Sequence, residues 1–238
     1  MLSAPEVVAA SRNFICVRPQ TYESSEEAKV LTYVFSGRKG LQNTSFALLD
    51  PDGKKISRGG RSASMVFGEL EAIEAALKET AEPYSKEAKA IEALPVVRDL
   101  RLALNVAAAD LRPLIVVRGE DEKKANELAM SVAKFAWSEE LIGTCHYVVL
   151  FTEETVEDFT PALGVTVVEP DPYGLGGKSL VHVAADAEPK ALGKALTKTV
   201  EAYEVESREY SAHVREARRR GIRWETEIPV TDTGRRRK

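Results

Sequence analysis

The chain has 238 residues, of which 44% are hydrophobic and 29% are charged, and it carries a formal net charge of −4. This balance is typical of globular proteins, and the length suffices for two domains of about 100 residues each. No apolar run approaches the roughly 20 residues of a membrane-spanning helix. The first ten residues lack the basic start and apolar core of a signal peptide. We therefore expect a cytoplasmic protein, or a secreted or periplasmic one whose signal has been removed.

The first half of the chain is expected to hold two helices and three strands. The helices are predicted over residues 3–13 and 68–93, and the strands over residues 14–17, 46–49 and 55–57. A Pro-Asp-Gly turn at residues 51–53 joins the last two strands, because proline fixes φ and glycine permits positive φ. These elements define a predicted domain over residues 1–94. Compared with the second half, it lacks an opening strand that would correspond to residues 114–117.

The second half has a fuller set of elements, which ends in one long helix and an extended tail. Its strands are short, β-branched apolar runs of the kind found in buried strands. Leu128, Val132 and Phe135 follow the three- and four-residue spacing of a helix. The predicted helices cover residues 100–110, 120–140 and 190–220, and the predicted strands cover residues 114–117, 147–151, 165–168 and 180–184. These elements define a predicted domain over residues 95–221, followed by a basic tail over residues 222–238.

Two separated segments of the first half recur in the second half at the same offset of 119 residues. The first match sets Ala76, Leu77, Thr80, Glu82 and Tyr84 against Ala195, Leu196, Thr199, Glu201 and Tyr203. The second match sets Leu48–Asp52 against Val167–Asp171. Chance could produce either match alone, but two matches at one offset favour an internal duplication.

Two stretches carry a resemblance to the thioredoxin-like superfamily. Phe46–Arg58 resembles the third and fourth strands of that family with the turn between them, and Leu104–Val117 resembles its lead-in helix and first strand. The resemblance implies an α/β fold of two thioredoxin-like βαβ-ββα halves related by the internal repeat, with a long C-terminal helix and an extended arm. It also implies a CxxC dithiol between the first strand and first helix, where the helix N-terminus lowers the pKa of a thiol. The corresponding residues Val117–Lys123 contain no cysteine, so no catalytic residue of the family carries over.

The cysteines and histidines predict no metal site and no other bound cofactor. Cys16 and Cys145 form neither a CxxC nor a zinc pattern, and each begins an apolar run, so we expect buried free thiols. His146 follows Cys145, but adjacent residues of a strand face opposite sides and cannot easily share an ion. His182 is expected to be a hydrogen-bonded histidine of the core.

One loop of the first half is a candidate anion site. Residues 59–62 follow a predicted strand and precede a predicted helix, so their backbone amides could cradle an anion beside two arginines. The candidate residues are Arg58, Gly59, Gly60, Arg61 and Ser62. The alternative is a flexible loop that supplies a helix N-cap at Ser62 or Ser64.

Residues 207–238 are basic, with ten Lys/Arg against five Asp/Glu, whereas the remainder of the chain has 23 against 32. Few aromatic residues accompany the basic run Arg215–Arg223, which disfavours nucleic-acid binding. The asymmetry favours docking on a protein partner or on the acidic remainder of the chain. Trp224–Val230 alternates apolar and polar residues, so this extended arm could add to a sheet edge.

Taken together, these features favour a non-catalytic thioredoxin-like tandem that acts as a protein-interaction or scaffold module and associates with itself, for example as a homodimer. Two alternatives stay open. One is a thiol-disulfide oxidoreductase whose CxxC lies upstream of these residues, and the other is a small-anion-binding protein.

Overall fold

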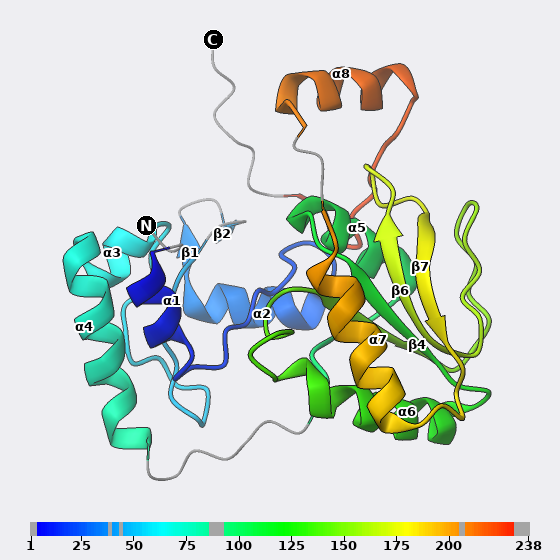
Figure 1. The fold of residues 1–238 in the computed structure, drawn as a ribbon. Coiled ribbons are helices and arrows are strands. Elements are labelled where there is room, and N and C mark those ends of the chain that lie inside the picture. Colours follow the sequence, from blue (N-terminus) through cyan, green and yellow to red (C-terminus); the bar gives the residue numbers. More distant parts are fainter. Residues whose placement is uncertain (1–3, 38–39, 43–44, 86–92, 205–207, 231–238) are drawn as a thin grey trace. The chain divides into compact units, whose positions relative to one another are not determined.

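Figure 1 shows the α/β fold of the chain in a computed structural model, which describes residues 4–37, 40–42, 45–85, 93–204 and 208–230. None of the helices in these ranges is long and apolar enough to cross a membrane. The chain divides into two compact units. Unit 1 comprises Met1–Lys89 together with Arg223–Lys238, and unit 2 comprises Ala90–Ile222.

Unit 2 is built on a five-stranded sheet with the strand order β3-β5-β4-β6-β7. Its strands are β3 (Val96–Val97), β4 (Leu114–Arg118), β5 (His146–Leu150), β6 (Gly164–Pro170) and β7 (Gly177–Val183). Its helices are α5 (Leu100–Asp110), α6 (Glu122–Ala136), α7 (Pro189–Glu201) and α8 (Tyr210–Arg219). β3, β4 and β5 run parallel, whereas β6 is antiparallel to β4 and β7 is antiparallel to β6. The carboxyl ends of the three parallel strands therefore lie at the same end of the sheet. β7 is an outermost strand, so one of its sides forms an edge of the sheet.

Helices cover both faces of this sheet, which explains why its central strands are continuous apolar runs. α5 packs on one face, and α6 with α7 packs on the other (Figure 1). In β4, Leu114 and Val116 face α5, while Ile115 and Val117 face α6 and α7, and all four side chains are fully buried. Complete burial stabilises the fold by about 1.5–3 kcal/mol per side chain of this size.

The sequence predicts most elements of unit 2 within a few residues, with two exceptions. It does not predict β3, and the single long helix over residues 190–220 is wrong. The chain instead forms α7, which ends at Glu201, and a separate helix α8, which begins at Tyr210. Glu209 starts the second helix, because its carboxylate accepts hydrogen bonds from the backbone N–H groups of Ser211 and Ala212.

Unit 1 consists of short helices and a small hairpin. Its helices are α1 (Pro5–Ser11), α2 (Ser25–Val34), α3 (Ala63–Phe67), α4 (Leu70–Ala81) and the 3-10 helix η1 (Glu82–Tyr84), and its strands are β1 (Ser36–Gly37) and β2 (Gly40–Leu41). β1 and β2 pair antiparallel. The core is formed where Val7 and Ala10 of α1 meet Ile73 and Leu77 of α4.

The predicted helices of the first half are present in shorter form, but its first predicted strand is absent. α1 and α4 lie within the predicted helices over residues 3–13 and 68–93, although residues 86–92 lie outside the described part of the chain. Residues 14–17 form no strand, and Ile15 and Val17 are 69% and 75% exposed. These apolar residues have no neighbouring strand to pair with among the described residues of unit 1.

The predicted hairpin over residues 46–49 and 55–57 is also reduced. It survives as isolated antiparallel bridges, which join Phe46 to Gly60 and Leu49 to Lys55. The internal repeat is therefore not reflected in the sheets, because unit 2 has five paired strands and the described residues of unit 1 hold only the β1–β2 pair. The duplication stays a prediction from the sequence.

The arm Trp224–Val230 forms no strand, so its predicted addition to a sheet edge is wrong. It contacts unit 1 just before α2 instead. The indole Nε1 of Trp224 donates to Oε1 of Glu23 at 2.7 Å, and the N–H of Ile228 donates to the carbonyl of Tyr22 at 3.0 Å. Both Tyr22 and Glu23 are buried. The arm thus belongs to unit 1, whereas the prediction from the sequence set residues 222–238 apart as a basic tail.

Candidate functional site

Ligands of α/β sheets commonly bind at the carboxyl ends of the parallel strands. In unit 2, Arg118 lies at this end of the sheet. The arginine ends β4, and its side chain is only 17% exposed. Its Nη1 donates to the carbonyl of Pro161, and its Nη2 lies 3.7 Å from Oε2 of Glu153. The buried Nε has no hydrogen-bond partner among the described residues. Arg118 therefore connects the loop after β5 to the carboxyl end of β4.

In the turn between β4 and α6, where the resemblance implies a dithiol, Asp121 and Gly119 form hydrogen bonds within unit 2. Oδ1 of Asp121 accepts a hydrogen bond from the N–H of Lys124 at 2.8 Å and so caps α6. The N–H of Gly119 donates to the carbonyl of Leu150 at 3.0 Å. A Cβ at Gly119 would lie 2.2 Å from the backbone nitrogen of Ala125, so no side chain fits there.

Cys145 and His146 point to opposite sides of the sheet, as predicted for adjacent residues of a strand. Sγ of Cys145 donates to Oη of Tyr147 at 3.0 Å within the core, whereas Nε2 of His146 lies 2.9 Å from Oδ2 of Asp110. Burial raises the pKa of Cys145, although hydrogen bonds with Tyr147 and Thr144 oppose this, and burial also raises the pKa of Tyr147. The described residues contain no cluster of three or more His, Cys, Asp or Glu that could hold a metal ion.

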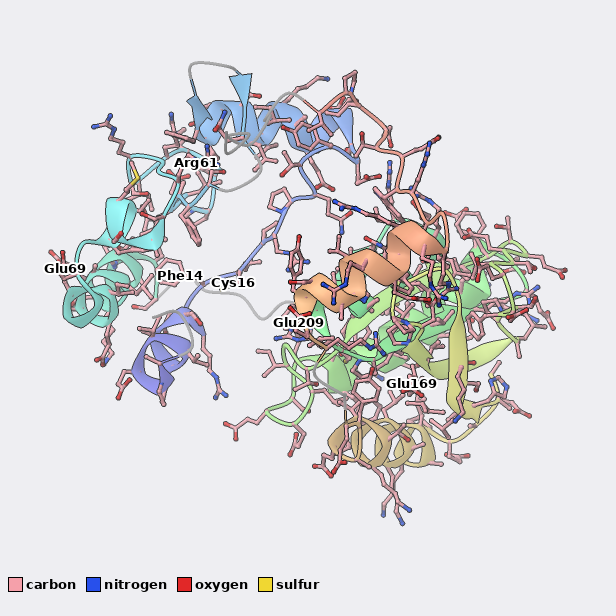
Figure 2. All side chains as sticks on the ribbon, turned by 90° about the horizontal axis from the view of Figure 1, so that it is seen from above. Phe14, Cys16, Arg61, Glu69, Glu169 and Glu209 are labelled. Carbon is pink, nitrogen blue, oxygen red and sulfur yellow. The ribbon has the colours of Figure 1, made fainter. Side chains whose placement is uncertain are left out.

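The predicted burial of two other residues is wrong. Cys16 lies exposed on the extended segment after α1 (Figure 2), and its Sγ is 3.8 Å from the carbonyl of Ser11. His182 is exposed on β7, although its Nδ1 lies 3.0 Å from Oγ1 of the buried Thr166. Both errors have one cause, because the segment of Cys16 has no partner strand in the described residues and β7 is outermost in its sheet.

The groups of the candidate anion loop are largely engaged within unit 1. The N–H of Gly60 donates to the carbonyl of Phe46 at 3.0 Å, and Nη1 of Arg61 donates to Oε1 of the buried Gln42 at 2.6 Å. Oγ of Ser62 caps α3, which is the alternative considered for this loop. The anion site itself stays a prediction.

The basic helix α8 is attached to unit 2 through the turn between β6 and β7. The rings of Tyr173 and His213 stack with their centroids 4.3 Å apart, and Oη of Tyr173 donates to the carbonyl of His213 at 3.2 Å. The guanidinium of Arg220 lies 5.1 Å from the centroid of the Tyr173 ring. Part of the basic run thus contacts its own chain.

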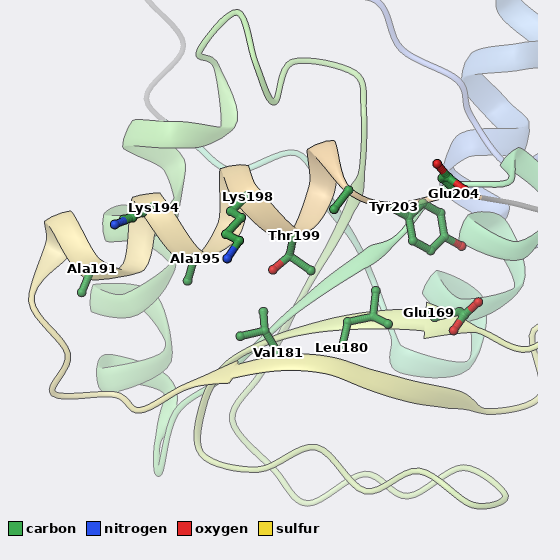
Figure 3. Close-up of a pocket in the computed structure, with 11 residues that line it drawn as sticks. Glu169, Leu180, Val181, Ala191, Lys194, Ala195, Lys198, Thr199, Tyr203 and Glu204 are labelled. Carbon is green, nitrogen blue, oxygen red and sulfur yellow. The ribbon is translucent and has the colours of Figure 1, made fainter.

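A groove of about 730 Å³ lies between α7 and the outer strand β7 (Figure 3). This volume is within the range of about 300–1,000 Å³ that is typical of ligand sites. Residues at four-residue spacing share one face of a helix. On α7, Leu192, Leu196 and Val200 form the buried stripe, and Ala191, Ala195 and Thr199 form the stripe that lines the groove. The groove exists because these three groove-lining side chains are small.

A bulge in β7 adds apolar surface to the groove. Val167 pairs with Val181, but the next residue of β6, Val168, pairs with Ser179, so Leu180 has no residue opposite it. A bulge of this kind redirects a side chain. Leu180 and Val181 both line the groove, whereas adjacent residues of a regular strand would face opposite sides.

Charged and polar side chains border the groove. Lys194 and Lys198 extend from α7, while Glu169, Tyr203 and Glu204 lie towards the end of the helix (Figure 3). Neither lysine forms a salt bridge with a described residue. Burial raises the pKa of Tyr203, the nearby carboxylate of Glu169 raises it further, and Arg208 opposes both effects. The Tyr203 hydroxyl is therefore a neutral hydrogen-bond donor at the end of the groove.

Comparison with known protein families, with curated proteins and with solved structures gives no match to this chain. The candidate site therefore rests on the geometry described above.

Proposed function

We propose that the chain is a non-catalytic, thioredoxin-like protein-interaction module whose partner surface is the groove between α7 and β7. The order of elements in unit 2 supports the thioredoxin-like part of this proposal. β4-α6-β5 is followed by β6-β7-α7, which is the βαβ-ββα arrangement that the resemblance implies.

The proposal is carried by the contrast between two places in unit 2. At the turn where the resemblance implies a dithiol, Arg118 and Asp121 are bonded to the loop and helix of unit 2 itself. At the groove, apolar side chains and two lysines border a volume of about 730 Å³. The lysines pair with no described residue, so their charges are available to a partner. Binding at the groove is thus better supported than thiol chemistry at the turn.

Insulin reduction in the presence of dithiothreitol tests the non-catalytic part. The full chain should leave the rate of insulin precipitation at the value of the buffer, because its two cysteines form no CxxC pair and are single free thiols, Cys16 in unit 1 and Cys145 buried in unit 2. A rate clearly above the buffer value would contradict the proposal.

Blocking the groove tests the binding part. Ala195→Trp places an indole in the groove, and the matched control Met130→Trp places the same ring on α6, where Met130 is 67% exposed and outside the groove. A protein partner retained by the immobilised full chain should be retained by Met130→Trp and lost by Ala195→Trp. Equal retention by all three chains would show that the groove is not the partner surface.

A further inference from the structure

We infer that the groove takes an extended peptide segment in which acidic residues adjoin β-branched ones, and that this segment adds to β7 as a further strand. The inference rests on the proposed function and names its ligand. Three independent features of unit 2 support it: the free edge of β7, the room beside that edge, and the charge at its rim.

The edge of the sheet supplies the first feature. Among the described residues β7 pairs only with β6, so the backbone groups on its other side are available to another strand. A peptide that adds to a sheet edge gains main-chain hydrogen bonds, and pockets for its alternate side chains give specificity. The bulge at Leu180 interrupts this edge and Lys178 adds a charge to it, as is common where a protein limits unwanted pairing. The available pairing is therefore short, and side-chain contacts must contribute to the affinity.

The room beside the edge supplies the second feature. Side chains of an added strand that point to the α7 side would enter the space over Ala191 and Ala195. Leu180 and Val181 form the apolar wall on the β7 side of the groove (Figure 3). Valine and threonine suit these positions of an added strand, because β-branched side chains pack well beside neighbours on a sheet.

The charge at the rim supplies the third feature. Lys194 and Lys198 lie one helical turn apart on α7 and border the groove. A peptide carboxylate placed beside them gains an attraction that a neutral side chain lacks. Glu169 and Glu204 at the Tyr203 end of the groove disfavour acidic residues there, so the acidic residues of the ligand should be confined to the end that holds the lysines (Figure 3).

A peptide titration of the isotope-labelled full chain, followed by backbone amide NMR, tests the inference. The probe is Ac-DDVTVQ-NH2, the neutral control is Ac-NNVTVQ-NH2, and a third peptide carries N-methyl groups on both valines. We expect the probe to shift amides of Leu180, Val181 and Ala195 and to bind about tenfold more tightly than the neutral control. The N-methylated peptide should bind more weakly than the probe, because it has lost donors for the strand ladder.

Charge variants make the test specific. Lys194→Glu with Lys198→Glu should abolish the preference for the acidic probe. The control, Lys123→Glu with Lys134→Glu, makes the same change in net charge on α6, outside the groove, and should preserve the preference. Equal affinity for the acidic and neutral peptides at the same amides would overturn the acidic ligand but leave the groove as the partner surface. If no peptide shifts these amides at millimolar concentration, the proposed function loses its surface as well.

Discussion

Replacing Trp224 by phenylalanine tests how much the arm stabilises unit 1. The indole Nε1 donates to the Glu23 carboxylate at 2.7 Å, and Glu23 is only 7% exposed. Phenylalanine keeps an aromatic ring but removes the donor. A hydrogen bond to a charged group contributes about 1.5–3 kcal/mol, and a buried acceptor that loses its donor is costly. We therefore expect Trp224→Phe to lower the unfolding free energy of unit 1 by about 2 kcal/mol.

The two tryptophans of the chain lie in different units, which supplies a matched control. Trp137 in unit 2 donates its indole N–H to the carbonyl of Ala93 at 3.0 Å. Because this acceptor is uncharged, Trp137→Phe should cost unit 2 only about 1 kcal/mol. Native-state hydrogen exchange measures both units in one sample, with the amide of Ile73 in α4 reporting on unit 1 and that of Val116 in β4 on unit 2.

A loss of about 2 kcal/mol corresponds to roughly 30-fold faster exchange. Trp224→Phe should therefore accelerate exchange at Ile73 by about that factor and leave Val116 unchanged. Trp137→Phe should instead accelerate exchange at Val116, by a smaller factor, and leave Ile73 unchanged. Unchanged exchange at Ile73 in Trp224→Phe would refute the reasoning, because the arm would then contribute nothing measurable to unit 1.

In the native protein the exposed Cys16 should react with Ellman's reagent, while the buried Cys145 should react only after unfolding, so two thiols reacting at equal rates would contradict the fold. Burial raises the pKa values of Cys145 and Tyr147 above their ordinary values of 9.0 and 10.0. The stability that depends on these groups being neutral is therefore complete below the ordinary values and is lost as the pH rises above them. The urea midpoint of unit 2 should fall above about pH 9, and it should fall less in Tyr147→Phe. Gly174→Ala should destabilise unit 2 by about 3 kcal/mol in urea unfolding, because φ is +67° and the new Cβ would lie 2.3 Å from the backbone of α5. The control Gly143→Ala has a similar φ of +69° but open space around the new Cβ, so it should cost only about 1 kcal/mol.

The sequence predicts unit 2 better than unit 1 because burial leaves a clear pattern only where a strand has neighbours. β4 and β5 are covered on both faces, so their runs of valine, leucine and isoleucine identify them without further information. Residues 14–17 have the same apolar composition but no partner strand among the described residues, and composition alone cannot distinguish these cases. The arm misleads for a related reason, since its alternation reflects contacts with Tyr22 and Glu23 and not a strand ladder.

The candidate groove could be predicted only in part. Helical spacing places Ala191, Ala195 and Thr199 on one stripe of α7, and a stripe of small residues beside a buried one indicates unfilled space. The bulge that turns Leu180 towards this stripe depends on the register between β6 and β7, for which the sequence carries no local signal. The contacts of Arg118 are equally hidden, because they join β4 to a loop more than thirty residues further along the chain.

Because unit 1 is built from two separate stretches of chain, it can be completed during synthesis only after unit 2 has been made. Unit 2 is one continuous stretch, so every strand of its sheet is available once Ile222 has left the ribosome. Unit 1 needs Trp224 and Ile228 against its buried residues, and these are translated only after unit 2. Domains are usually completed in the order in which they are translated, whereas in this chain the unit that begins first is completed last. Until the arm has been made, unit 1 has its small core but lacks the hydrogen bonds that Trp224 and Ile228 donate to Glu23 and Tyr22.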